Sequence, residues 1–464
     1  MWGIVFLMIF AGVYSVYGGL KSVAWTDVIQ VVFLVGGGLI TAYFALRAAS
    51  PDGNSMIEGF RTVFNFVKET PGDMHFKMVI PEGSVSVDAA TGEQFDIFKD
   101  LPGLALIFGA IWLTNIGYWG FNQYIIQKGL AAKNLHEAKK GLIFAGYLKI
   151  LIPLIVVIPG ITAYVLFNHP ELTDRVADLS GTIGKADDAY PWLLRNFAPV
   201  GIKGVAFAAL VAAVVSSLAS MLNSTSTIFT MDIYKQVINK NASEKQLVRV
   251  GRIVAILALL IAMFAAKPLL GGLDQAFQYI QEYSGYIYPG VVVVFGMALL
   301  WKRATNKAAL WTAIATIPAG IIIKLAFPEM GFQLRMGYVF IILVIMAVTI
   351  SMLDKKHLVE DHETVKHKKS LLRGAYIMFA LSAVCIVFGI IYSKPLASLA
   401  FEAIFTMAAI LAFVGIILYT NAKSKVKDAK AYDYEPQLFK MGPGLTLGAM
   451  GIVVILGVLY AVFW

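Results

Sequence analysis

The stretch from Gly204 to Asp232, GVAFAALVAAVVSSLASMLNSTSTIFTMD, decides how the chain folds. It is long enough to cross a bilayer, because a transmembrane helix needs about 20 largely apolar residues. Hydroxyl and amide side chains nevertheless fall at membrane depth within it: Ser216, Ser217, Ser220, Asn223, Ser224, Thr225, Ser226 and Thr227. A hydroxyl buried in hydrocarbon without a partner costs about 2–7 kcal/mol. Two interpretations follow: a packing seam of small residues with inter-helix hydrogen bonds, or a helix that binds a hard cation through oxygen atoms.

The composition of the whole chain is that of a membrane protein. Of its 464 residues, 58% are hydrophobic and 14% are charged, whereas a soluble domain is about 45–50% apolar and about 25% charged. We therefore expect an all-α protein that crosses the bilayer many times. The single cysteine, Cys385, excludes an intrachain disulfide framework and a cysteine-based metal site. The net charge of +9 does not indicate a nucleic-acid partner, because the basic residues lie in short loops between apolar spans.

Twelve apolar spans are predicted, and every second loop between them is basic. By the positive-inside rule the basic loops are cytoplasmic, and the long loops 48–102 and 168–203 are outside. Both ends of the chain are then expected outside, with no cleavable signal before the first span. The spans lie near residues 3–19, 26–47, 103–127, 141–167, 204–232, 250–270, 274–301, 306–327, 336–353, 372–393, 400–421 and 442–463.

A polar and aromatic run, TNIGYWGFNQY, occupies residues 114–124 inside the span 103–127. Two glycines among amides and aromatic rings are poorly suited to a continuous helix, and a broken helix at membrane depth has to line a cavity. Aromatic faces beside amide donors, such as Tyr118 and Trp119 near Asn115, suit a polyhydroxylated sugar ring. The alternative is an aromatic belt at the membrane interface.

Further polar positions lie within or at the start of other spans. Lys149 either extends to the cytoplasmic edge of the membrane or points into a polar cavity. Gln278 and Gln281 share one helical face, either at the vestibule end of an ordinary helix or in a substrate site, and a kink is expected after them at Pro289. Asp27 is either a helix N-cap or a carboxylate on a path for cations.

Four stretches of the chain also carry a family resemblance. They are KSVAWTDVIQ (21–30), YWGFNQY (118–124), VSSLASMLNS (215–224) and AFQYIQEY (276–283). They resemble the sodium/solute symporter family, and most closely its bacterial sodium/galactose (sodium/glucose) members. The resemblance runs from the start to about residue 353 and covers the last span again. It implies a LeuT-like fold, with two inverted five-helix repeats and with sugar and sodium near the middle of the membrane.

The resemblance implies roles for individual residues. Sodium would be held by the carbonyl of Ala213 and by carbonyl or hydroxyl groups of Ser216 and Ser217. Tyr118 would be the inner aromatic gate, and Asp27 would lie on the sodium path towards the cytoplasm. The sugar-binding set would be Asn115, Lys149, Gln281, Tyr118, Trp119 and Gln278.

On this template the chain falls into four parts. Residues 1–47 would end the first repeat, 48–102 would form an extracellular loop, 103–301 would be the second repeat, and 302–464 would be peripheral helices. The broken first helix of the family, which supplies the other half of the sodium site, has no counterpart, so three or four N-terminal helices are expected to be missing. An extra hairpin, 372–421, is expected before the last span.

The predicted function is sodium-coupled import of a galactose- or glucose-type sugar by alternating access, in the plasma (bacterial inner) membrane. The expected partners are sugar, sodium and the lipid bilayer. Alternatives are a symporter for inositol, proline, pantothenate or sialic acid, a sodium-gated sensor, or a fragment that does not transport. A membrane enzyme is not expected, because all six histidines lie in loops and supply no nucleophile pair or metal cluster at depth.

Overall fold

The computed structural model divides the chain into two compact units. Unit 1 comprises residues 1–76, 123–276 and 444–457, and unit 2 comprises residues 77–122, 277–443 and 458–464. The residues that the structure describes are 2–70, 72–81, 83–87, 94–100, 103, 111–177, 179, 183, 186–270, 276–354, 358–360, 364–391, 398–424, 426–428 and 440–463.

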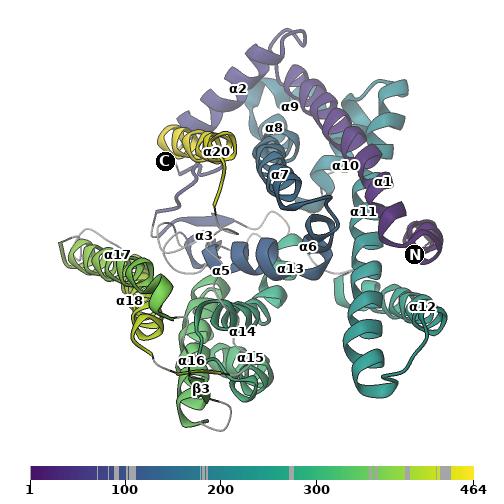
Figure 1. Ribbon diagram of the computed structural model, residues 1–464. Helices are drawn as coiled ribbons and strands as arrows, with labels where there is room; N and C mark the ends of the chain where they lie inside the picture. Colours follow the sequence, from purple (N-terminus) through teal and green to yellow (C-terminus); the bar gives the residue numbers. More distant parts are fainter. Residues whose placement is uncertain are drawn as a thin grey trace. The chain divides into compact units, whose positions relative to one another are not determined.

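The described residues are almost entirely helical (Figure 1), which confirms the predicted all-α class. Among them, nine helices are long and apolar enough to cross a membrane, and a bent pair of shorter helices adds a tenth span. The strands of the described residues form two short antiparallel pairs, β1 (Val85–Val87) with β2 (Gln94–Asp96) and β3 (Leu358–Glu360) with β4 (Val426–Asp428).

Unit 1 is organised around the serine-rich stretch, which forms the long helix α11. Its helices, with α20 shared between the units, are α1 (Trp2–Ala48), α2 (Met56–Glu69), α6 (Gln123–Leu130), α7 (Leu135–Ile155), α8 (Val157–Asn168), α9 (Pro170–Ala177), η2 (Ala186–Asp188), α10 (Ala189–Phe197), α11 (Val200–Ile228), the π-helical η3 (Phe229–Ile238), α12 (Glu244–Leu270) and α20 (Pro443–Val462).

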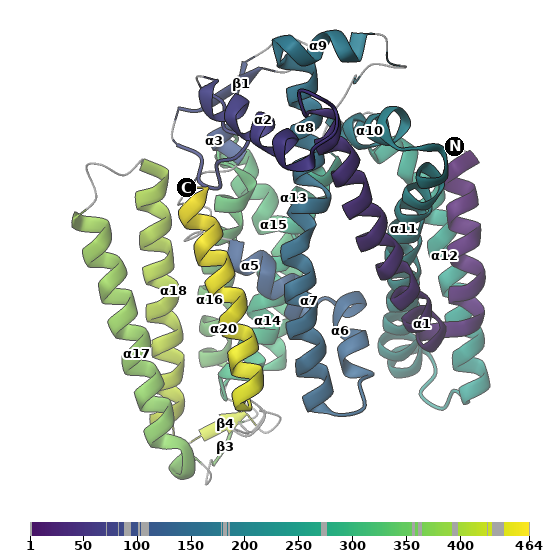
Figure 2. The same ribbon diagram turned by 90° about the horizontal axis from the view of Figure 1, so that it is seen from above.

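Helix α1 bends at Gly19 and packs along α11. Gly19 has φ 57°, a left-handed conformation that glycine adopts without steric cost. Figure 2 shows the chain changing direction at this bend. The two spans predicted here, 3–19 and 26–47, correspond to two helical arms that meet at this kink, where the backbone angles of Gly19 are not helical. Gly37 brings α1 close to α11, since a Cβ there would lie 2.8 Å from the Cβ of Ala209.

Unit 2 contains the remaining helices. They are α3 (Ile97–Asp100), α5 (Ile111–Ile116), the π-helical η1 (Gly117–Phe121), α13 (Ala276–Gly285), α14 (Tyr288–Leu300), α15 (Asn306–Ala326), α16 (Phe332–Leu353), α17 (Thr364–Ile391) and α18 (Ser398–Lys423). Helices α17 and α18 pack on each other as a hairpin, in the region where an extra hairpin is predicted.

The core of unit 2 holds the bent pair α13–α14 against α15 and α16. The two short helices meet at an angle of 47°, which confirms the predicted kink. Large apolar side chains such as Leu113, Met297 and Leu343 are buried in this core. Close approach is set by small residues: Gly290 contacts the side chain of Thr316, and a Cβ on Gly320 would lie 2.6 Å from the ring of Tyr286.

The predicted span 103–127 is not one continuous helix in the described part of the chain. Helix α5 passes into the π-helical turn η1, Asn122 is extended, and α6 begins at Gln123. This break confirms the broken helix that the two glycines and the amides predict. Residues 104–110 of the predicted span lie outside the described residues. Gly117 allows η1 to pack on α14, because a Cβ there would lie 2.6 Å from the ring of Tyr288.

Candidate functional site

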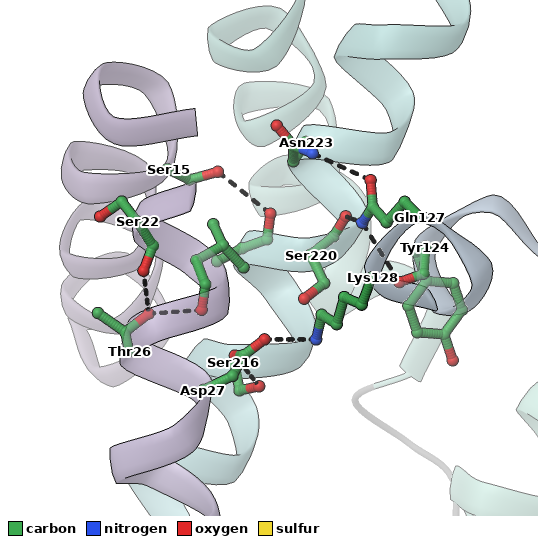
Figure 3. A network of polar contacts seen from close by, with 12 residues as sticks. Ser15, Ser22, Thr26, Asp27, Tyr124, Gln127, Lys128, Ser216, Ser220 and Asn223 are labelled. Carbon is green, nitrogen blue, oxygen red and sulfur yellow. Dashed lines mark hydrogen bonds and ion pairs between the residues drawn. The ribbon is translucent and has the colours of Figure 1, made fainter. Parts of the chain in front are cut away.

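The carboxylate of Asp27 is the centre of a polar cluster between α1, α6 and α11 (Figure 3). Asp27 is buried, with 8% of its surface exposed. Its Oδ1 accepts a 2.5 Å hydrogen bond from the hydroxyl of Ser216, and its Oδ2 forms an ion pair with the ammonium of Lys128. Asp27 lies in the interior of α1, so the N-cap interpretation is wrong. The structure brings a carboxylate and a serine of the polar stretch together from two helices that are long and apolar enough to cross a membrane.

Helix α6 is fixed to α11 by an amide next to Lys128. Nε2 of Gln127 donates to the carbonyl of Ser220 at 3.1 Å and to the carbonyl of Tyr124 at 3.2 Å. Oε1 of the same side chain accepts a 3.0 Å hydrogen bond from Nδ2 of Asn223. Gln127 is 5% exposed. Because both ends of a buried amide are paired, this contact sets the register of α6 against α11.

The hydroxyls of the serine stretch do not all have the same surroundings. Ser15 donates to the carbonyl of Ala219 at 3.1 Å, and Ser226 donates to the carbonyl of Gly251 at 2.8 Å, so hydroxyls join α11 to its neighbours as a packing seam. The hydroxyl of Ser220 differs from these. It is buried without a hydrogen-bond partner among the described residues, and Figure 3 shows it directed towards the space that the Lys128 ammonium occupies.

The other two predicted sodium ligands lie on α11 beside Ser216. Ala213 is half-buried, whereas the side chain of Ser217 is exposed and the structure does not place it in the Asp27 cluster. Successive residues of a helix point about 100° apart, so Ser216 and Ser217 cannot both face α1. The assignment of Ala213, Ser216 and Ser217 to a sodium ion stays a prediction.

The predicted sugar residues of unit 2 lie on α5, η1 and α13. Nδ2 of Asn115 donates to the carbonyl of Ile111 at 2.8 Å, and the side chain is exposed. The rings of Tyr118 and Trp119 contact each other edge to face, with centroids 5.5 Å apart, on the π-helical turn. Such turns often occur at functional sites. Gln278 and Gln281 are half-buried on α13.

The remaining predicted contact, Lys149, belongs to unit 1. It lies on α7 and its side chain is exposed. The sodium residues and Lys149 are therefore in one unit and the other sugar residues are in the second unit. Gln275, which precedes Gln278 by three residues and would lie on the same helical face, is outside the described residues.

One ionic cluster in unit 2 was missed by the sequence reasoning. Glu282 pairs with the ammonium of Lys324 at 2.9 Å and with Nη2 of Arg335 at 2.7 Å. Arg335 is 5% exposed, and its guanidinium lies 5.4 Å from the ring centre of Tyr286. The cluster ties α13 to α15 and α16, one residue away from Gln281. In the sequence, the cluster is indicated only by charged residues within or beside apolar spans: Glu282 in 274–301, Lys324 near the end of 306–327, and Arg335 just before 336–353.

Comparisons with known proteins agree with this architecture. The sodium:solute symporter family pattern matches residues 1–316. The sodium/glucose cotransporter of Vibrio parahaemolyticus is 48% identical over 343 residues, covering 73% of this chain and 60% of the relative. Sodium/myo-inositol cotransporter 2 of Homo sapiens is 34% identical over 333 residues, covering 69% of this chain and 46% of the relative. The chain thus spans about half to three-fifths of the length of these relatives.

A solved structure shows the same fold. It is the substrate-bound outward-open state of a Na⁺-coupled sialic acid symporter, with a TM-score of 0.59 and 22% identity. The likeness covers 76% of this chain and 66% of that one. At this identity it bears on the fold alone, and it confirms the predicted LeuT-like class.

Proposed function

Because the chain belongs to the sodium:solute symporter family, we propose that it couples the inward movement of sodium to the uptake of a sugar. Family membership makes it a multi-pass plasma-membrane transporter rather than an enzyme. The proposal rests above all on the bond between Ser216 and Asp27, which places hydroxyl and carboxylate oxygens side by side within two apolar helices long enough to cross a membrane. Ionisable groups in such positions commonly mark ion pathways.

Sodium is proposed to bind through oxygens of α11. Hard cations prefer carbonyl, hydroxyl and carboxylate ligands, and unpaired backbone or side-chain oxygens at membrane depth suit them. The carbonyl of Ala213 and the groups of Ser216 and Ser217 are the proposed ligands, and Asp27 is proposed to attract the ion on its way to the cytoplasm. The exposed hydroxyl of Ser217 supports this proposal, since it is available to an ion.

The transported solute is proposed to be a sugar. The 48% identical relative is a sodium/glucose cotransporter, which favours a hexose. Asn115, Gln278 and Gln281 are proposed to bind its hydroxyl groups, while Tyr118 acts as the gate. Lys149 and Trp119 are proposed as further contacts. The identity to a sodium/myo-inositol cotransporter makes a cyclic polyol the second candidate.

Sodium supplies the driving force in this proposal. One elementary charge crossing 100 mV is worth about 2.3 kcal/mol, which corresponds to a concentration ratio of about fifty for the sugar. Coupling requires that sodium favour the conformation that binds sugar. Each ligand must then raise the affinity for the other by the same factor.

Uptake into proteoliposomes tests the proposal. Labelled galactose, myo-inositol and proline are offered under an inward sodium gradient, and a choline gradient is the control. We expect accumulation of galactose that depends on sodium and is abolished when the gradient is dissipated. Equal uptake of galactose in choline, or accumulation of proline alone, would contradict the proposal.

A further inference from the structure

Both carboxylate oxygens of Asp27 are engaged by other side chains. Oδ1 accepts from Ser216 at 2.5 Å, Oδ2 is paired with Lys128, and the carboxylate side chain is only 11% exposed. A buried charge without a partner is strongly destabilising, so this position requires a positive charge. In the structure, the ammonium of Lys128 supplies that charge.

Besides the Asp27 carboxylate, the hydroxyls of Ser216 and Ser220 lie on the side of the ammonium that faces α11 (Figure 3). The Ser220 hydroxyl is 1% exposed, has no hydrogen-bond partner among the described residues, and points towards the ammonium in Figure 3. The hydroxyl of Ser216 donates its proton to Asp27, so the lone pairs of its oxygen remain available to a cation. A carboxylate and two hydroxyls suit an ammonium and an alkali cation alike, because both are bound through oxygen.

The ammonium can leave this position without undocking α6. The side chain of Lys128 is 38% exposed and lies in the last turn of α6, on a flexible four-carbon stem. Gln127, its neighbour, is buried and bonded to Ser220 and Asn223. The backbone of α6 is thus held by the amide, while the lysine head can move between Asp27 and water.

We infer that Lys128 is a tethered cation that occupies Asp27, and that a sodium ion reaching Asp27 has to displace it. The inference rests on the proposed function, in which Asp27 lies on the sodium path. Exchange of one monovalent cation for another keeps the buried carboxylate neutralised throughout. Competition by the tethered ammonium lowers the apparent sodium affinity, and thereby eases release of the ion.

Sodium binding to the purified chain of 464 residues tests this inference. Binding of ²²Na⁺ is measured by scintillation proximity, with displacement by unlabelled NaCl, for the unmutated protein, Lys128→Met and Lys133→Met. Lys133 is the matched control, because it is an exposed lysine in the turn that follows α6. We expect Lys128→Met to raise the apparent affinity by about 3- to 10-fold, as expected for removal of a partly exposed ion pair, and Lys133→Met to leave it unchanged. The gain should disappear in the double variant Asp27→Asn, Lys128→Met.

A second measurement uses the unmutated protein, so it does not depend on a variant that folds. Lysines are acetylated with an N-hydroxysuccinimide ester in NaCl or in choline chloride, and modification of Lys128 is quantified by mass spectrometry relative to Lys133. Sodium should raise the rate at Lys128 by about 3-fold or more, because the displaced ammonium is exposed to solvent. No change at Lys128, in a protein that binds sodium, overturns the inference.

The two failures are distinguishable. If the unmutated protein binds sodium but Lys128→Met has the same or a lower affinity, the tethered-cation inference is wrong and the proposed function stands. If neither the unmutated protein nor Lys128→Met binds sodium, the proposed function itself is wrong, and the inference is overturned with it.

Discussion

The hydroxyl of Ser216 on α11 donates a 2.5 Å hydrogen bond to the carboxylate of Asp27 on α1. The two residues are 189 positions apart in the chain, and each lies inside a helix that is long and apolar enough to cross the membrane. The bond therefore joins two membrane helices through polar groups that neither helix could accommodate alone. The proposed sodium path depends on this pairing.

We predict that Asp27 and Ser216 act as a unit in sodium binding. Asp27→Asn and Ser216→Ala should each weaken ²²Na⁺ binding by about tenfold, and the double variant should lose no more than the stronger single one. Residues in contact show coupling energies of about 0.5–3 kcal/mol. Thr26→Val is the control, because the Thr26 hydroxyl donates to the Ser22 and Val23 carbonyls of its own helix. Fully additive losses would show that the two side chains act separately.

Ser217→Ala tests the proposed ligand set on α11. Its hydroxyl is exposed, so the free energy of unfolding should change by no more than about 0.5 kcal/mol. Sodium affinity should nevertheless fall, because one oxygen ligand is removed. Thr225→Val, an exposed hydroxyl on the same helix, is the matched control. An unchanged sodium response in Ser217→Ala would exclude this residue from the ion site.

The sugar assignment is tested by Gln281→Ala and Asn115→Ala. Each variant should raise the KM for galactose about tenfold or more, since an unpaired sugar hydroxyl costs about 1–3 kcal/mol. Asn196→Ala is the control, because Asn196 donates to a carbonyl four residues earlier at 3.0 Å, as Asn115 does at 2.8 Å. Kinetics equal to those of the unmutated protein would remove the altered residue from the binding set.

The Glu282 cluster should contribute unequally to stability. Glu282→Gln leaves the buried guanidinium of Arg335 without its carboxylate, so we expect a loss of about 1–3 kcal/mol. Lys324→Met removes a partner whose side chain is 48% exposed, and should cost at most about 1 kcal/mol. Thermal unfolding in detergent compares the two. Equal destabilisation would mean that Arg335 does not need Glu282.

The contact of Gly290 with Thr316 predicts a rescue experiment. A Cβ at Gly290 would overlap the Thr316 side chain, so Gly290→Ala should destabilise the protein by about 1–3 kcal/mol. Thr316→Ala relieves part of the overlap, because it removes Oγ1 and Cγ2, the two atoms nearest to the added methyl group, and leaves Cβ at 2.7 Å. The double variant should therefore unfold at a higher temperature than Gly290→Ala alone, and the absence of such rescue would place the strain elsewhere.

Hydropathy alone predicts the long packing helices well, because their span length and composition are dictated by the bilayer. The predicted spans 306–327 and 336–353 correspond to α15 (Asn306–Ala326) and α16 (Phe332–Leu353). Glycine, proline and amide runs also indicate where helices break, as at Asn122 and between α13 and α14. Hydropathy could not show that the two arms of α1 meet directly at a kink at Gly19, because a kink and a short loop have similar composition.

Side-chain pairing was the part that the sequence could not supply. Lys128 counts as an ordinary cytoplasmic charge under the positive-inside rule, yet it pairs with Asp27, about a hundred residues away. Glu282 likewise finds Lys324 and Arg335 on two later helices. Such pairs depend on which helices pack together in space, and a single sequence does not show which helices these are. The family resemblance named Asp27 and Ser216 separately, and the structure brings them into contact.

Equilibrium binding of labelled galactose to the purified chain, titrated with NaCl or with choline chloride, tests sodium coupling most directly. We expect that sodium raises the galactose affinity, that galactose raises the sodium affinity by the same factor, and that Asp27→Asn removes both effects. Galactose binding of equal affinity in the two salts would contradict it.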